Sequence, residues 1–140
     1  MIGWNAPMKR FLALLLALTL AISLTACSTQ PKPFYTDAED VPASDLKKLP
    51  TDEVLRAVLE YPEIINIFLY SSDKWGVEQT AVHCTALKVF LTRPDARQVL
   101  DETIADPAPM QERMQTDDNN KEMMPYVLRI ISNAMDEMGK

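Results

Sequence analysis

This chain of 140 residues contains one histidine, three glycines and two cysteines. Any histidine-based catalytic set or ordinary zinc site would therefore have to use His83, yet the residues four positions before and after it are Gln79 and Leu87 rather than acids. So few glycines leave no glycine-rich loop that could hold a phosphate. These scarcities disfavour nucleotide-binding proteins, zinc proteins and histidine-dependent enzymes, and we expect no catalytic residue, cofactor or metal.

The sequence also lacks basic clusters and any segment in which apolar and polar residues alternate. It has 14 basic and 20 acidic residues, which give a net charge of −6. Binding to nucleic acid requires clustered Lys and Arg that neutralise phosphates, so we expect no nucleic-acid partner. A half-buried strand requires apolar residues with a period of two. The sequence therefore predicts an all-α protein.

One long apolar run is present near the N-terminus. Residues 11–24 contain no charge and follow Lys9 and Arg10 directly. A positive segment, an apolar segment and then small residues are the three parts of a secretory signal peptide. The 16 residues from Phe11 to Ala26 are fewer than the roughly 20 that a membrane-spanning helix needs. The run therefore predicts a signal peptide, and Met8 is an alternative start to Met1.

The sequence Leu24-Thr25-Ala26-Cys27, which closes this run, resembles the lipobox of bacterial lipoproteins. The resemblance implies that the lipoprotein signal peptidase recognises Leu24, Thr25 and Ala26 and cleaves before Cys27. It also implies that a diacylglyceryl group, and with it fatty acid such as palmitate, is attached to the Cys27 sulfur. The protein would then be anchored through lipid to the extracytoplasmic face of the cell membrane. Two alternatives are a secreted protein cleaved by the ordinary signal peptidase and an uncleaved N-terminal anchor.

Cleavage would leave a more acidic chain. The loss of Lys9 and Arg10 leaves 12 basic and 20 acidic residues, a net charge near −8. This charge indicates a soluble surface rather than attraction to anionic headgroups. An acylated Cys27 could not form a disulfide with Cys84, which lies in an apolar helical pattern. We therefore expect Cys84 to be an inert thiol in the core.

The composition divides the chain into a signal peptide (1–26), a lipidated cysteine with a flexible tether (27–50) and a helical domain (51–140). Four prolines and few large apolar residues lie between residues 28 and 50. Proline-rich chain is extended and semi-rigid, so these 23 residues could hold a domain tens of ångströms from the lipid. The exception is Phe34-Tyr35, which either docks on the domain or forms a short recognition patch.

From residue 51 onward, apolar residues recur with helical spacing. Thr51 is the expected N-cap of a first helix that Pro62 ends, and Pro62 then begins a second helix. Pro125 should lie in the first turn of the last helix. We expect Ile64, Ile65, Phe68 and Leu69 to form the buried face of the second helix. We predict a small bundle of four to five helices near residues 51–61, 62–70, 74–91, 94–104 and 123–138, with a loop or one short turn at 110–120.

Part of this region has a second resemblance. Tyr61-Pro62, Gly76 and the sequence Leu91-Thr92-Arg93-Pro94-Asp95-Ala96 are similar to small helical extracytoplasmic domains of unassigned function in Gram-positive bacteria. This similarity covers residues 55–100 and implies a helical fold. Its residues are structural, so it implies no chemistry.

Methionines and carboxylates are the remaining candidates for function. Methionine sulfurs can bind copper(I), and Met110 and Met114 share a face if their segment is helical. Methionines also fill cores and line flexible grooves for partner helices. A candidate partner groove consists of Met123, Met124, Met135 and Met138, with Trp75 or Tyr126 at its rim.

Glu102 and Asp106 lie four residues apart beside Asp101, and paired carboxylates can perform acid–base catalysis when one of them is buried. We expect them instead to form a solvated acidic face. The favoured function is a membrane-anchored, non-catalytic module that binds an envelope protein or a peptide. The alternatives are a carboxylate-based hydrolase and a methionine-based copper-binding protein.

Overall fold

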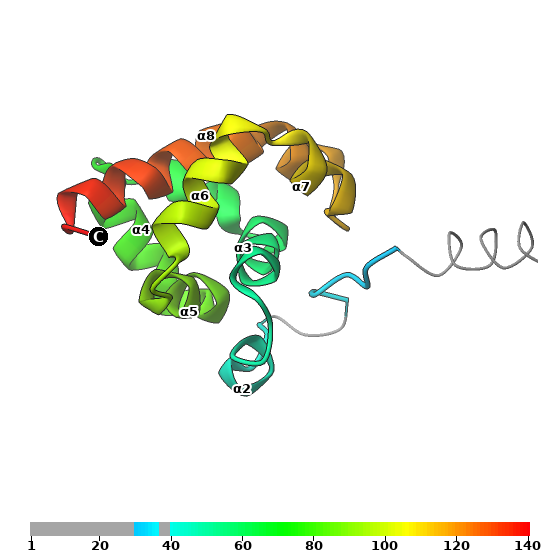
Figure 1. Cartoon of the computed structure of the whole chain (residues 1–140). Coiled ribbons are helices and arrows are strands. Elements are labelled where there is room, and N and C mark those ends of the chain that lie inside the picture. Colours follow the sequence, from blue (N-terminus) through cyan, green and yellow to red (C-terminus); the bar gives the residue numbers. More distant parts are fainter. Residues whose placement is uncertain (1–29, 37–39) are drawn as a thin grey trace, which may run out of the picture. The chain divides into compact units, whose positions relative to one another are not determined.

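The computed structural model describes residues 30–36 and 40–140, so the predicted signal peptide and lipobox lie outside the described residues. Residues 31–140 form one compact unit, which is described by itself below. In its described residues the unit is all-α, with no strand, as predicted (Figure 1). Its elements are α2 (Ala43–Leu46), α3 (Thr51–Glu60), the 3-10 helix η1 (Ile64–Leu69), α4 (Asp73–His83), α5 (Thr85–Thr92), α6 (Ala96–Ala105), α7 (Ala108–Arg113) and α8 (Asp118–Glu137).

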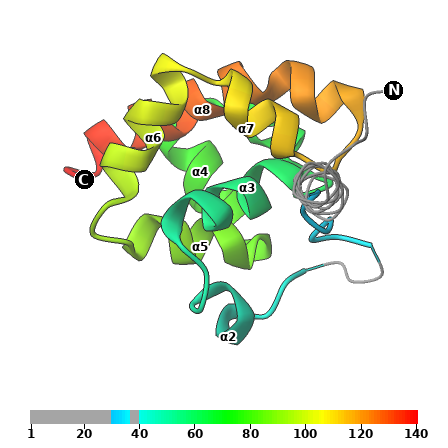
Figure 2. The same cartoon turned by 45° about the vertical axis from the view of Figure 1, so that its right-hand side comes forward.

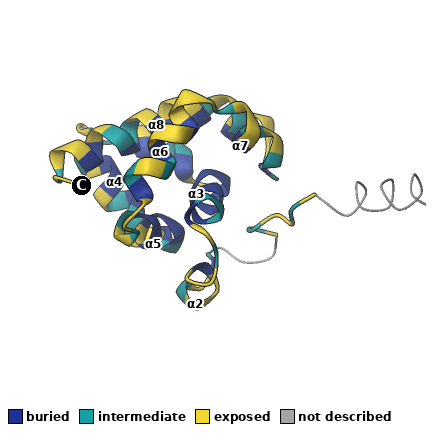
Figure 3. Ribbon diagram, viewed as in Figure 1, coloured by how far each residue is buried: buried dark blue, intermediate teal, exposed yellow. Residues whose placement is uncertain are grey.

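Two helices organise this unit. Eight of the ten residues of α3 are buried, and α3 contacts α5, α6, α8 and η1 (Figure 3). The long helix α8 packs along α4, α6 and η1 as well as α3 (Figure 2). The core therefore lies around α3. None of the helices in the described residues has the length and hydropathy of a membrane span.

In the described residues the helices are more numerous than the predicted four or five. The predicted helix at 74–91 is divided at Cys84, whose φ of −107° and ψ of 98° are not helical. The carboxylate of Asp40 accepts hydrogen bonds from the backbone N–H of Thr85 at 3.2 Å and from its hydroxyl. Asp40 thus caps the first residue of α5 from a distant part of the chain, which is why the periodicity of residues 74–91 does not reveal the break.

The second helix also differs from the prediction because it is a 3-10 helix. Such a helix has three residues per turn, so Ile64 and Ile67 share its buried face. Of the four residues expected to be buried, Ile64 is buried and Ile65 half-buried. Phe68 and Leu69 are exposed, with exposed fractions of 38% and 79%. The prediction for these two residues is wrong because it assumed the spacing of an α-helix.

The last helix begins five residues earlier than predicted, with Pro125 in its interior. The side chain of Asp117 caps its start by accepting the N–H of Asn120 at 2.8 Å. A proline inside a helix leaves the carbonyl four residues earlier without its N–H partner. Here that carbonyl belongs to Lys121, and the side-chain amide of Gln111 donates to it at 3.0 Å. The neighbouring α7 therefore supplies the bond that Pro125 removes.

The region predicted as a tether is also different. Val41 and Leu46 are buried, α2 packs against α5, and Arg93 donates to the Leu46 carbonyl at 3.0 Å. Phe34 and Tyr35 pack against the core, so the docking alternative for this pair is the one observed. The compact unit consequently starts at Pro31 rather than at Thr51.

The bond across Pro125 can be tested with a double-mutant cycle. Gln111→Ala should lower the free energy of unfolding by about 1 kcal/mol, because the Lys121 carbonyl loses its partner. In a Pro125→Ala background the same change should cost clearly less, because the N–H of the new alanine can donate to that carbonyl. Urea denaturation of the four proteins measures both costs. Equal costs in the two backgrounds would contradict this role of Gln111.

Candidate functional site

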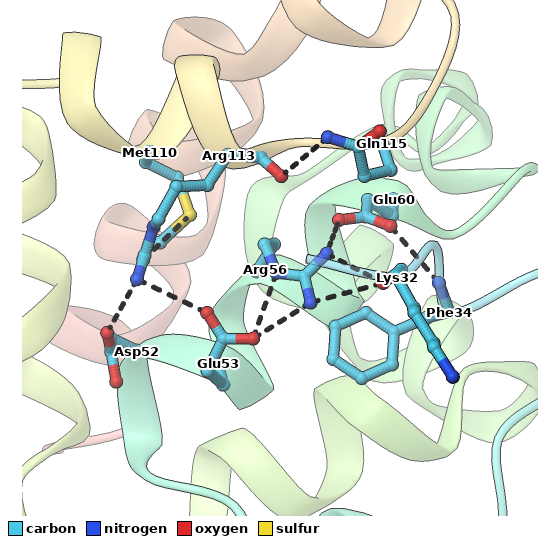
Figure 4. Close-up of polar contacts among 9 residues, drawn as sticks. All are labelled: Lys32, Phe34, Asp52, Glu53, Arg56, Glu60, Met110, Arg113 and Gln115. Atoms are coloured by element: carbon cyan, nitrogen blue, oxygen red, sulfur yellow. Dashed lines mark hydrogen bonds and ion pairs between the residues drawn. The ribbon is translucent and has the colours of Figure 1, made fainter. Parts of the chain in front are cut away.

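The buried Arg56 on α3 has several polar partners in the described residues (Figure 4). Its side chain is 3% exposed. The guanidinium lies 2.5 Å from the carboxylate of Glu60 and 2.8 Å from that of Glu53. It also donates to the carbonyl of Lys32 at 3.3 Å and stacks over the Phe34 ring, 4.3 Å from the ring centre. Arg56 therefore joins its own helix to a segment more than twenty residues earlier in the sequence.

Glu60 completes this cluster from the other side. Burial raises the pKa of Glu60 above its ordinary value, and the positive charge of Arg56 opposes that rise. The carboxylate accepts the backbone N–H of Phe34 at 3.3 Å and a backbone hydrogen bond from Gln115, in the α7–α8 connection. Three separate segments of the chain thus meet at one buried ion pair. We interpret this ion pair as a structural element, because its polar atoms bond to other residues of the fold.

Replacement of Arg56 tests this structural role. Arg56→Met should lower the free energy of unfolding by about 3–5 kcal/mol, because it leaves Glu60 buried without a positive partner. Arg113→Met is the matched control: Arg113 also pairs with Glu53, but it is 38% exposed, so its loss should cost less than about 1 kcal/mol. Urea denaturation measures both. Similar losses in the free energy of unfolding for the two variants would contradict the structural role of Arg56.

A pocket of about 390 Å³ lies beside His83 and is lined by Asp40, Tyr61, Pro62, Glu63 and His83. His83 is exposed, and the Asp40 carboxylate is engaged by Thr85. No three His, Cys, Asp or Glu side chains in the described part of the chain are grouped so that they could hold a metal ion. The pocket therefore offers polar contacts for a small molecule beside the exposed imidazole of His83.

Cys84 is buried, as predicted from its apolar surroundings. Burial raises the pKa of its thiol to about 11. The Tyr35 hydroxyl lies near this thiol, has no nitrogen or oxygen partner, and has its pKa raised by burial. A thiol whose pKa is this high is protonated at neutral pH and is a poor nucleophile.

The predicted carboxylates have a mixed outcome. Glu102 and Asp106 both line a cleft of about 440 Å³, whose walls come from the start of α3, from α6 and from α7, whereas Asp101 is not among its lining residues. Asp52 and Asp95 add two further acids to the same cleft. Glu102 and Asp106 are both exposed, and Glu102 accepts a hydrogen bond from Gln98 at 3.0 Å. The burial that acid–base catalysis would require is therefore missing at these two residues.

The methionines are mostly packed inside the unit. Met124 and Met135 are buried, while Met123 and Met138 are half-buried. A partner at the surface would therefore reach only Met123 and Met138 of the four residues in the candidate groove. The two methionines considered for copper, Met110 and Met114, are 4% and 1% exposed and belong to the core.

Several exposed apolar residues lie close together in the sequence, where η1 leads into α4. Phe68, Leu69 and Trp75 are exposed, and Trp75 makes an edge-on contact with the Tyr70 ring at 5.4 Å between ring centres. We call these four residues the aromatic corner. Sequence reasoning found only Trp75, as a rim residue. The three-residue spacing of Ile64 and Ile67 was the signal that could have placed Phe68 and Leu69 outside.

Comparisons of the chain with known protein families, with curated protein sequences and with solved structures found no match.

Proposed function

We propose that this protein is a lipid-anchored lipoprotein of the extracytoplasmic face of the cell membrane, and that its helical unit is a non-catalytic module that binds a protein or peptide. The observation that carries the anchoring is the sequence Leu24-Thr25-Ala26-Cys27 at the end of an uncharged apolar run. The binding role is supported by the aromatic corner, in which Phe68, Leu69 and Trp75 are exposed.

The chemistry of the anchor is sufficient by itself. Burial of acyl chains contributes about 0.8 kcal/mol per methylene, and stable anchoring takes two chains or one chain with a polybasic patch. A diacylglyceryl group on the Cys27 sulfur supplies two chains at one position. No basic cluster is then needed, which agrees with the acidic composition of the chain.

The aromatic corner is the surface that best fits a protein or peptide partner. Trp and Tyr dominate the binding energy of many interfaces because they bury a large area and still offer a polar group. Leu69 is 79% exposed and Trp75 is 47% exposed, so a bound partner could bury a large apolar area here. We therefore place the contact with the partner at this corner rather than at the predicted methionine groove.

Replacement of Cys27 tests the anchoring. Wild-type protein in bacterial cells should incorporate labelled palmitate and sediment with membranes, whereas Cys27→Ser should incorporate none and lose the cleavage before residue 27. Cys84→Ser is the control, since its sulfur is buried and should not affect labelling. Gel fluorography and mass spectrometry of the N-terminus measure both effects. Palmitate labelling that persists in Cys27→Ser would refute the anchor.

Site-specific photo-crosslinking tests the binding role. A photoreactive side chain at Leu69 should capture one recurrent envelope protein or peptide, and Trp75→Ala should reduce that yield at least fivefold. Val82, on α4, is the matched control because it is also an exposed apolar residue, with an exposed fraction of 62%. The binding proposal fails if Leu69 captures nothing recurrent, or if Val82 captures the same molecule equally well.

A further inference from the structure

The segment of residues 31–36 is part of the helical unit. Its Lys32 carbonyl and Phe34 ring contact the buried Arg56, and its Phe34 N–H donates to Glu60. Tyr35 packs edge-on against Tyr61 at 5.7 Å between ring centres. Four successive contacts with α3 and its C-terminal end therefore hold this segment in place.

This docking leaves a short connection to Cys27. Pro31 is four positions after Cys27, with three residues between them, and four residue steps of fully extended chain span at most about 14 Å. The 23-residue tether predicted from composition would have reached roughly 70 Å at about 3 Å per residue. A compact unit of 110 residues has a radius of gyration near 13 Å and therefore a diameter above about 30 Å. The available connection is shorter than the unit is wide.

We propose that the helical unit lies directly on the lipid surface, with the end that carries Lys32, Pro33 and Gln115 toward the bilayer. This inference rests on the proposed lipidation of Cys27. A connection shorter than the unit prevents the unit from turning its opposite end toward the membrane. This end contacts the headgroup layer of the membrane that holds the Cys27 lipid.

The long helix α8 sets the direction of the opposite end. It starts at Asp118, close to Gln115, and its 20 residues extend about 30 Å at 1.5 Å per residue. The two views place residues 31–36 and the C-terminus on opposite sides of the unit (Figures 1 and 2). Asp73, at the start of α4, accepts from Asn133 at 2.8 Å, so the start of α4, which carries Trp75, lies beside the C-terminal half of α8. The unit thus presents the start of α4, with Trp75, away from the lipid.

Energy transfer from tryptophan to a dansyl-labelled lipid headgroup tests this orientation. Trp75 is the only tryptophan after Cys27, so the chain from Cys27 onward already carries the distal probe. Trp75→Phe combined with Thr116→Trp moves the probe to the connection before α8, which is far from Cys27 in sequence. The chain is coupled through Cys27 to a maleimide-headgroup lipid in phosphatidylcholine vesicles, so the test does not depend on lipidation in cells. Cys84 is buried and should not couple, which Cys27→Ala checks.

Transfer from residue 116 should be at least threefold more efficient than transfer from Trp75. Insertion of 20 Gly and Ser residues between Gln30 and Pro31 should remove most of this difference. If Thr116→Trp does not fold, Glu112→Trp on the exposed surface of α7 takes its place. Equal or reversed efficiencies in the chain of native length, or no effect of the insertion, would overturn the proposed orientation. Failed palmitate labelling in cells combined with the expected transfer pattern here would overturn the lipoprotein proposal alone.

Discussion

The buried charge of Arg56 is the constraint on which the arrangement of this unit depends. Removing a guanidinium from water costs several kcal/mol, so its donors must all find partners inside the protein. Each of its three nitrogens does so, through Glu53, Glu60 and the Lys32 carbonyl. Because one of these partners lies outside the helices, satisfying the charge fixes the chain before α2 as well as α3. The N-terminal boundary of the unit follows from this cluster.

Local sequence signals predicted the fold class and some helix limits. Pro62 lies just after the end of α3, as predicted, but the N-cap of α3 is Pro50 rather than Thr51, which is the first helical residue. The errors come from interactions between distant residues. Asp40 caps α5 and Gln111 bonds the carbonyl left by Pro125, so the observed helix ends depend on partners that no local pattern contains. In the sequence, Arg56 is one charged residue in an apolar stripe. The composition of the proline-rich segment before it gives no sign that this segment is docked on the helices.

The candidate sites also divide into those defined by neighbouring residues in the sequence and those formed by distant segments. The proposed lipobox rests on four adjacent residues and could be suggested from the sequence alone, whereas the cleft that contains Glu102 and Asp106 forms only when α3, α6 and α7 come together. The sequence does not distinguish core methionines from surface methionines. Met124 and Met135 are buried in the core, so they cannot take part in a surface groove. Only Met123 and Met138 of the predicted groove are partly exposed, and we therefore propose the exposed aromatic corner as the surface for a partner.

Amide hydrogen exchange at Phe34 tests the central claim most directly. Its N–H donates to the buried carboxylate of Glu60, so we predict that this amide exchanges only when the whole unit opens, with a protection factor similar to those of α3. Residue-resolved exchange followed by nuclear magnetic resonance measures this amide and the α3 amides in one experiment. Exchange at the rate of an unstructured peptide, while the α3 amides stay protected, would show that the segment is not docked and would contradict the account.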